Sequence, residues 1–281
     1  MTRSKTFQFR SRGKLLFAQK WWPKDYPRAV VIFVHSWAEH SGRYADVSGH
    51  LTKQGYAAYS FDFEGHGQSE GFRGAIFNFQ QWVTDVNAFV ASVQSELRSV
   101  PIFLCGFGMG GCAVAYAITA EHHEIEGVIF AASGLVVSKK LSKFKILMSW
   151  LLGGLLPKWP ISLLPPNQMS SVVAEQQHYD EDPLVYHSYM NAGTAKELLL
   201  ANLHIGQRLT SIDVPMLVLH GAEDGLVSPE GATAVYTQAA SLDKTLHLYP
   251  NILHDVFHEN NRLEVFERVR TWLDARTKEQ W

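Results

Sequence analysis

The stretch that decides the fold is Pro101-Ile-Phe-Leu-Cys105, which continues into Gly106-Phe-Gly108-Met109-Gly110-Gly111 and then into the small-residue run 112–117. A short apolar run that ends in glycines and continues into small residues is typical of a buried strand, a sharp turn and a closely packed helix. The turn between the predicted strand and the predicted helix fits two different motifs, and they imply different chemistry.

The first motif is the dinucleotide fingerprint G-x-G-x-x-G. Gly106, Gly108 and Gly111 match it, and they lie between a predicted strand and a predicted helix, as the motif requires. The rest of that fingerprint is missing. The turn lies about a hundred residues into the chain, and the next predicted strand, 128–132, ends on Ser133 instead of an acid that would bind a ribose. We therefore do not expect a dinucleotide at this turn.

The second motif is the nucleophile elbow G-x-S-x-G, in which a serine is held at a strained backbone angle between a strand and a helix. In this chain Gly106 and Gly110 stand at the two outer positions, and Gly108 stands where the serine belongs. Glycine tolerates the strained angle best. The turn is therefore expected to form, while the attacking hydroxyl group is absent.

An elbow predicts two further residues, an acid after a later strand and then a histidine near the C-terminus. Asp224 follows the predicted strand 214–220, and His254 follows the predicted strand 245–249. Either residue alone is more simply explained as a turn aspartate or a loop histidine. Their order and positions together predict a Ser-Asp-His site that lacks its serine, with His254 as the base and Asp224 as its partner. The alternative acid and base are Glu223 and His258.

Short apolar runs and amphipathic stretches alternate along most of the chain, which predicts an α/β fold with a mainly parallel sheet flanked by helices. An N-terminal hairpin is expected at 6–10 and 15–21, and further strands at 29–35, 56–62, 101–106, 127–132, 214–220 and 245–249. Helices are expected from Asn78, from Ser228 and over 263–273. A length of 281 residues without a visible linker favours a single domain, 1–281.

Residues 134–205 interrupt the alternation and are too many for an ordinary connection, so we expect an inserted helical cap, or lid, within the domain. The cap includes a basic run, 138–145, followed by the uncharged run 146–156. Lysines beside an apolar run shorter than a membrane span are typical of a segment that lies on a membrane interface or lines an apolar pocket. A buried cap helix would have the same composition, so both alternatives stay open.

The composition excludes several classes of protein. With 25 Lys plus Arg against 27 Asp plus Glu and 46% hydrophobic residues, the chain is neither a disordered tail nor a basic nucleic-acid module. The absence of a run of about 18 apolar residues predicts a soluble, cytoplasmic protein with at most peripheral membrane contact. Cys105 and Cys112 are expected to be buried thiols, and the cluster 122–126 fits no zinc spacing.

Three further runs carry a resemblance to a known family. They are Val34-His35-Ser-Trp-Ala-Glu39-His40-Ser41-Gly42-Arg43-Tyr44, Asp62-Phe-Glu-Gly65-His66-Gly67-Gln68-Ser69-Glu70-Gly71 and Tyr179-Asp-Glu-Asp182-Pro183-Leu184-Val185. Together with the Gly-x-x-x-Gly-Gly elbow, they resemble the monoacylglycerol lipase and lysophospholipase branch of the α/β-hydrolases over nearly the whole chain. The resemblance implies a lid-covered pocket for a single acyl chain. It also implies hydrolysis of a small amphipathic lipid ester through a Ser-Asp-His triad, without a cofactor.

Two departures from the family pattern bear on activity. Gly108 replaces the serine, and a triad enzyme without its nucleophile can lose on the order of a million-fold in turnover. The family's His-Gly-x-Gly loop here reads His35-Ser36-Trp37-Ala38, and the resemblance implies that the backbone N–H groups of Trp37 and Met109 are the oxyanion donors.

These observations leave three hypotheses about function. The first is a carboxylic ester hydrolase of the monoacylglycerol lipase type that is inactive or impaired because of Gly108. The alternative, from another class, is a catalytically dead member of the fold that only binds a lipid or a protein partner. The third is slow hydrolysis by a water molecule that His254, backed by Asp224, activates at the vacant position.

Overall fold

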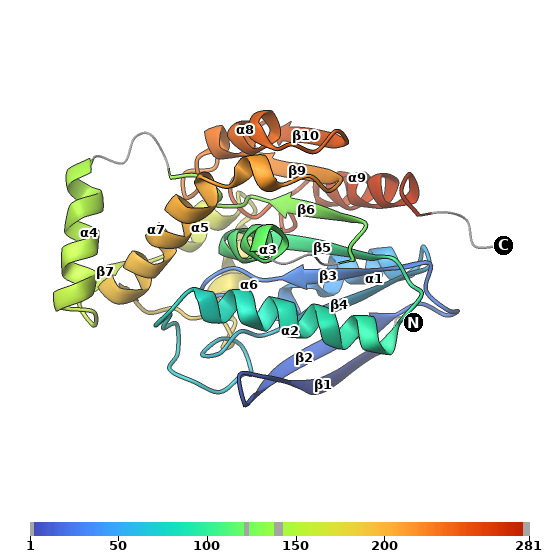
Figure 1. Cartoon of the computed structure of the whole chain (residues 1–281), viewed down its shortest axis with the longest axis horizontal. Coiled ribbons are helices and arrows are strands. Elements are labelled where there is room, and N and C mark those ends of the chain that lie inside the picture. Colours follow the sequence, from blue (N-terminus) through green and yellow to red (C-terminus); the bar gives the residue numbers. More distant parts are fainter. Residues whose placement is uncertain (1–2, 121–123, 138–142, 278–281) are drawn as a thin grey trace.

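The structure is a computed structural model that describes residues 3–120, 124–137 and 143–277. At its centre is an eight-stranded sheet in the order β1-β2-β4-β3-β5-β6-β9-β10 (Figure 1). The strands are β1 (Arg3–Ser11), β2 (Lys14–Trp22), β3 (Ala29–Val34), β4 (Tyr56–Phe61), β5 (Ile102–Phe107), β6 (Gly127–Ala131), β9 (Met216–Gly221) and β10 (Lys244–Tyr249). Strand β2 pairs antiparallel with β1 and β4, and every pair from β4 to β10 is parallel. The mainly parallel sheet and its N-terminal hairpin are thus confirmed.

Helices cover both faces of the sheet (Figure 1). They are α1 (Ala45–Thr52), α2 (Gln80–Glu96), α3 (Met109–Ala120), α8 (Pro229–Gln238) and α9 (Arg262–Asp274). Strand β3 shows why two helical layers are needed, because all six of its residues are apolar and buried. Its alternate residues Val30, Ile32 and Val34 join the core under α2, α3 and α8, whereas Val31 and Phe33 join the core under α1 and α9.

The helix starts agree with the expectations to within two residues. Helix α8 begins at Pro229, directly after Ser228. Helix α2 begins at Gln80 and not directly after Asn78, because the first turn is tighter than an α-helical one: the Gln81 N–H donates to the Asn78 carbonyl at 3.1 Å. The Asn78 side chain still accepts a hydrogen bond from the Gln80 N–H at 2.9 Å, so it satisfies one of the free donors at this helix end.

Between β6 and β9 the described residues form several further helices and strands, followed by the short 3-10 helix η2 (Leu209–Ser211). The helices and strands are α4 (Lys143–Leu155), β7 (Pro160–Ser162), α5 (Pro166–Met169), α6 (Val173–Glu181), β8 (Met190–Asn191) and α7 (Ala192–Gly206), and β7 pairs with β8 in a small sheet of their own. Helices α4 and α7 lie side by side at one end of the molecule (Figure 1). Of the basic run expected at 138–145, residues 138–142 lie outside the described residues. Within the described residues, no helix is long and apolar enough to cross a membrane.

Candidate active site

The predicted elbow lies at the carboxyl end of β5, where ligands of parallel sheets usually bind. Strand β5 ends at Phe107 and helix α3 begins at Met109, with Gly108 between them at a φ of +52°. The outer glycine Gly110 is required by packing, because a Cβ atom there would lie 2.2 Å from the Val34 carbonyl oxygen of the neighbouring strand. The strand, the turn and the helix therefore keep the geometry of an elbow although the central residue has no side chain.

Asp224 and His254 come together at the same edge of the sheet. Asp224 lies three residues after β9, and His254 lies in the loop after β10. Both side chains are buried, and Nδ1 of His254 donates to Oδ2 of Asp224 at 2.7 Å. The other carboxylate oxygen accepts the backbone N–H groups of Leu226 and Val227, each at 2.9 Å. The carboxylate is thus fixed from both sides and in turn fixes the imidazole.

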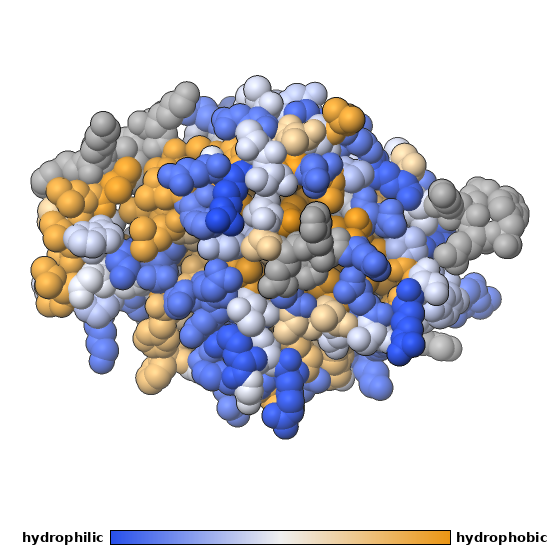
Figure 2. Space-filling model, in the orientation of Figure 1, coloured by the Kyte–Doolittle hydropathy of each residue, from blue (hydrophilic) through white to orange (hydrophobic). Residues whose placement is uncertain are grey.

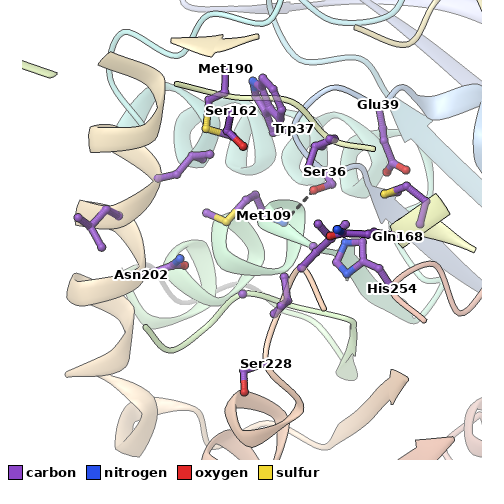
Figure 3. A pocket seen from close by; sticks show the side chains of 18 of the residues that line it. Ser36, Trp37, Glu39, Met109, Ser162, Gln168, Met190, Asn202, Ser228 and His254 are labelled. Atoms are coloured by element: carbon purple, nitrogen blue, oxygen red, sulfur yellow. Dashed lines mark hydrogen bonds between the residues drawn. The ribbon is translucent and has the colours of Figure 1, made fainter. Parts of the chain in front are cut away.

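The imidazole of His254 is turned toward Gly108. Its Nε2 lies 3.6 Å from the position that a Cβ atom on Gly108 would occupy. Since Nδ1 donates to Asp224, Nε2 is the nitrogen that can accept a proton from the cavity side. His254 borders the cavity together with Ser36, Trp37 and Met109 (Figure 3).

His220 is a third member of this cluster that the sequence reasoning did not find. It lies on β9, fully buried, with Nε2 at 3.0 Å from Oδ2 of Asp224 and at 3.1 Å from the Val227 carbonyl oxygen. The signal in the sequence is a histidine within a buried strand, four residues before the acid. We infer that it helps to hold the Asp224 carboxylate in place.

The electrostatics of the pair favour a charged carboxylate and a basic imidazole. Burial by itself raises the pKa of Asp224, but the adjacent His254 and the hydrogen bonds from both histidines hold that pKa well below its usual range. Burial by itself lowers the pKa of His254, but the Asp224 carboxylate raises it above the ordinary value of 6.5. At neutral pH, Asp224 is therefore ionised, and His254 binds a proton more tightly than a free imidazole.

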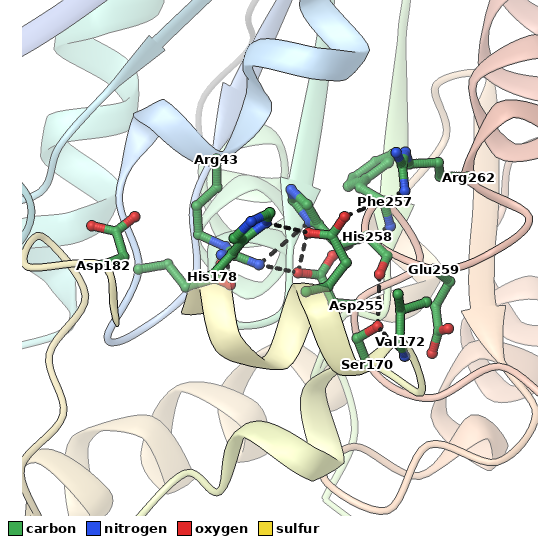
Figure 4. A network of polar contacts seen from close by, with 12 residues as sticks. Arg43, Ser170, Val172, His178, Asp182, Asp255, Phe257, His258, Glu259 and Arg262 are labelled. Atoms are coloured by element: carbon green, nitrogen blue, oxygen red, sulfur yellow. Dashed lines mark hydrogen bonds and ion pairs between the residues drawn. The ribbon is translucent and has the colours of Figure 1, made fainter. Parts of the chain in front are cut away.

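The alternative acid and base lie elsewhere. Glu223 is exposed, and His258 bonds through Nδ1 to Oδ2 of Asp255 at 2.9 Å. Arg43 completes this second buried network, since its guanidinium donates to Asp255 at 2.6 Å and to Glu39 at 3.1 Å (Figure 4). The network joins the loop after β3 to the loop after β10, and it brings the Glu39 side chain to the cavity wall, where burial raises the pKa of its carboxyl group.

The two residues implied as oxyanion donors also border the cavity. The Trp37 indole does not fill the space at Gly108, because its Nε1 donates to the Gly74 carbonyl at 2.8 Å and its ring packs edge-on against Tyr186. The Met109 backbone N–H already has an acceptor, the Oγ of Ser36 at 3.1 Å.

The cavity in front of Gly108 has a volume of about 530 Å³. Its far wall comes mostly from the segment between β6 and β9 and is mainly apolar. The apolar residues on that side are Val136, Val137, Leu163, Leu164, Met169, Met190, Leu198 and Leu199. Polar side chains also line the cavity, namely those of Ser36, Glu39, Ser162, Gln168, Asn202, Ser228 and His254 (Figure 3). A mainly apolar lining with a few polar groups is typical of a site for a small molecule.

Within the described residues, no group of three His, Cys, Asp or Glu side chains is placed to hold a metal ion. Residues 122 and 123 of the cluster 122–126 lie outside the described residues. Cys105 and Cys112 are both buried and unpaired, as expected.

Comparison with known proteins identifies the family. The family model described as "Serine aminopeptidase, S33" matches residues 25–261. The human monoglyceride lipase is 31% identical over 269 residues, which cover 94% of this chain and 88% of that enzyme. The chain belongs to the monoacylglycerol lipase-like branch of the α/β-hydrolases.

Two further relatives extend the comparison. The crystal structure of the monoacylglycerol lipase of Paleococcus ferrophilus superposes with a TM-score of 0.82 at 26% identity, covering 93% of this chain and 99% of that one. An uncharacterised abhydrolase domain-containing protein of Dictyostelium discoideum is 32% identical over 279 residues, or 98% of this chain. The chain spans only 29% of the length of that relative. The monoacylglycerol lipase-like fold thus extends over nearly the whole chain.

Proposed function

We propose that this chain binds lipid esters that carry a single acyl chain, and that it hydrolyses them poorly because Gly108 supplies no nucleophile. In this scheme the acyl chain lies against the apolar wall of the cavity, and the ester bond lies beside His254. Asp224 orients the imidazole, and the backbone N–H groups of Trp37 and Met109 correspond to the oxyanion donors of an active relative.

The observation that carries this proposal is the position of His254 in front of a residue without a side chain. Its Nε2 lies 3.6 Å from the vacant Cβ position, so a serine hydroxyl attached there would lie within hydrogen-bond reach. This geometry supports His254 and Asp224 as the base and its acid, and the missing nucleophile is one of the two groups whose loss costs most in such triads.

The volume of the cavity supports a small-molecule ligand. A volume of about 530 Å³ falls within the range of roughly 300–1,000 Å³ that small-molecule sites occupy. The names of the relatives support a lipid ester with a single acyl chain, since the human enzyme is a monoglyceride lipase and the Paleococcus enzyme is a monoacylglycerol lipase.

Binding and turnover are tested separately. A glycerol ether with one long alkyl chain, which no esterase can cleave, is titrated against the chain, and 1-monooleoylglycerol is used to measure hydrolysis. We expect saturable binding of the ether and a hydrolysis rate several orders of magnitude below that of a relative that retains its serine. A lack of binding, or turnover as fast as that of such a relative, would contradict the proposal.

A matched pair of variants locates the bound ligand. Leu198, on α7, is buried and borders the cavity, so Leu198→Trp should fill the cavity and abolish binding of the ether. Leu200, on the same helix, is 40% exposed and does not border this cavity, so Leu200→Trp should leave binding unchanged. Equal binding by the two variants would place the ligand elsewhere.

We further propose that the exposed side of α4 and the residues after it touch a lipid surface from which the ester is taken up. Several large apolar side chains are more than half exposed there, namely those of Leu147, Trp150, Leu155, Leu156 and Trp159. In Figure 2 this end of the molecule forms an apolar patch over the region of α4. A patch of this kind on a protein surface favours contact with lipid or with another apolar surface.

A further inference from the structure

The side chain of Ser36 occupies the space beside Gly108 that a nucleophile would need. A Cβ atom on Gly108 would lie 2.3 Å from the Ser36 Oγ and 2.8 Å from the Ser36 Cβ. Real Cβ atoms essentially never approach other heavy atoms within 3.0 Å. A serine at residue 108 is therefore compatible with His254 but not with Ser36 in its present position.

Ser36 also occupies one of the hydrogen-bond donors of the site. Its Oγ accepts the Met109 backbone N–H at 3.1 Å, and this contact is drawn as the dashed line in Figure 3. That N–H is one of the two that the family resemblance implies as oxyanion donors. An ester oxygen would have to displace the Ser36 hydroxyl in order to reach it.

The backbone of Ser36 is held from behind by His35. The Phe63 N–H donates to Nε2 of His35 at 3.0 Å, so the ring proton is on Nδ1, which donates to the Ser36 carbonyl at 2.7 Å. Burial lowers the pKa of His35 to about 3, so this neutral tautomer persists at neutral pH. The backbone and the Cβ atom of Ser36 are thus held in place, so the 2.8 Å contact with the Ser36 Cβ cannot be relieved by rotating the hydroxyl group.

The two departures from the family pattern, at Ser36 and at Gly108, consequently lie next to each other in the structure. The family's loop has glycine at the position of Ser36, and its elbow has serine at the position of Gly108, so the two residue types stand exchanged. The positions are 72 residues apart in the chain. Strands β3 and β5 bring them together, because they are neighbours in the sheet and both end at this edge.

We propose that Ser36 and Gly108 form one coupled unit that closes this site to ester hydrolysis. Ser36 excludes a side chain at residue 108 and occupies the Met109 donor, while Gly108 leaves the room that Ser36 needs. Recovery of hydrolysis then requires two substitutions and not one. This inference rests on the proposed function, because it assumes that the cavity admits a single-chain ester.

Four proteins test the coupling: the unmodified chain, Gly108→Ser, Ser36→Gly and the double variant. Each is assayed with 1-monooleoylglycerol and with a fluorophosphonate that labels activated serines. We expect the double variant to be labelled at residue 108 and to hydrolyse the ester at least about 100-fold faster than Gly108→Ser, the usual effect of freeing one oxyanion donor. We expect no labelling of Ser36 in the unmodified chain.

Three outcomes would overturn the coupling. Gly108→Ser alone could be as active as the double variant, Ser36 could be labelled in the unmodified chain, or the double variant could bind the alkyl glycerol ether and still not hydrolyse the ester. The last outcome shows that the binding function is kept while the coupling is absent. If neither the double variant nor the unmodified chain binds the ether, the proposed function itself is refuted.

A stability measurement tests the coupling even if Gly108→Ser folds poorly. Gly108→Ala adds the Cβ atom without a hydroxyl group. The change in melting temperature that it causes is measured in the unmodified chain and in the Ser36→Gly variant. The positive φ at residue 108 penalises both alanine variants equally. If Ser36 obstructs the Cβ atom, alanine lowers the melting temperature more when Ser36 is present, and an equal loss in the two backgrounds would refute the obstruction.

Discussion

Residue 108 lacks a hydroxyl group, yet the two residues that would activate such a group remain hydrogen-bonded to each other and buried. The Asp224 carboxylate has four donors, two from the backbone and two from the imidazoles of His254 and His220. Such a cluster stabilises the fold at this edge of the sheet independently of catalysis. The hydrogen bonds therefore give the pair a structural role whether or not residue 108 carries a nucleophile.

The His254–Asp224 pair predicts a specific pH dependence for any residual hydrolysis. A neutral His254 can take a proton from a water molecule, whereas the protonated ring cannot. Because Asp224 raises the pKa of His254, hydrolysis of an activated ester should increase with pH through a midpoint above 6.5. The rate is measured between pH 5 and pH 9 with an aryl ester of a short fatty acid.

The matching substitutions separate this effect from background hydrolysis. His254→Ala should lower the residual rate by roughly 10²-fold or more, which is the lower end of what a general base contributes. His178→Ala, which removes a histidine with a 74% exposed side chain, serves as the control. A rate that is independent of pH and unchanged by His254→Ala would exclude the activated water.

At the scale of whole elements, local sequence patterns predicted the strands well because the parallel strands other than β10, at the edge of the sheet, are short runs buried on both faces. They predicted the candidate triad positions because each such position follows the carboxyl end of a strand. They did not reveal the contact between Ser36 and Met109, since this contact depends on β3 and β5 being neighbours in the sheet. The position of His220 beside Asp224 was missed because a histidine within a buried strand, four residues before the acid, is a weak signal by itself.

The link between α6 and the loop after β3 gives a prediction for stability. Nε2 of His40 lies 2.9 Å from Oδ2 of Asp182, whose other oxygen accepts the Leu184 N–H at 2.8 Å. Burial alone would raise the pKa of Asp182, but the hydrogen bond from His40 lowers it to about 2. The ionised carboxylate therefore stabilises the fold above its unfolded pKa of about 3.9, and this contribution is lost as the pH falls through about 2.

Asp182→Asn should accordingly lower the free energy of unfolding by about 1 kcal/mol at pH 7. The value is small because the Asp182 side chain is 26% exposed and solvent screens the pair. Urea unfolding at pH 7 and at pH 2 measures the difference, which should shrink at the lower pH. The exposed Asp180→Asn is the control, and an equal loss in both variants would show that the His40 contact contributes nothing.

The exposed face of α4 gives a prediction for membrane contact. Replacing Trp150 and Leu155 by serine should weaken binding to phosphatidylcholine vesicles by about 10-fold or more, because each side chain contributes about 1.5–3 kcal/mol when it leaves water. Co-sedimentation with vesicles measures the effect. Leu242→Ser, which removes a fully exposed leucine between α8 and β10, should have no effect. Unchanged binding of the α4 variant would refute the contact.

On the scale of the whole molecule, the cavity lies between the sheet and the segment from α4 to α7, so a ligand there contacts both. Binding to the folded state alone raises the free energy of unfolding by about 2.7 kcal/mol at a ligand concentration of 100 times Kd. For a chain of this size that corresponds to a rise in melting temperature of roughly 5–10 °C.

Thermal unfolding with the alkyl glycerol ether should show this rise, and glycerol at the same concentration should not. The rise should disappear in Leu198→Trp, whose added ring fills the apolar wall of the cavity. An equal rise with glycerol would mean that the acyl chain is not what the cavity recognises.

The hydrogen bond from Met109 to Ser36 also bears on selectivity. In an active hydrolase, the free oxyanion donors form hydrogen bonds to a carbonyl oxygen and so distinguish esters from ethers and alcohols. Here the Met109 donor is already satisfied within the protein, so a ligand gains little from presenting a carbonyl group to it. The affinity of the cavity for a ligand should therefore depend on the length and shape of the hydrocarbon chain. An ester, an ether and a free alcohol of equal chain length should bind with nearly equal affinity.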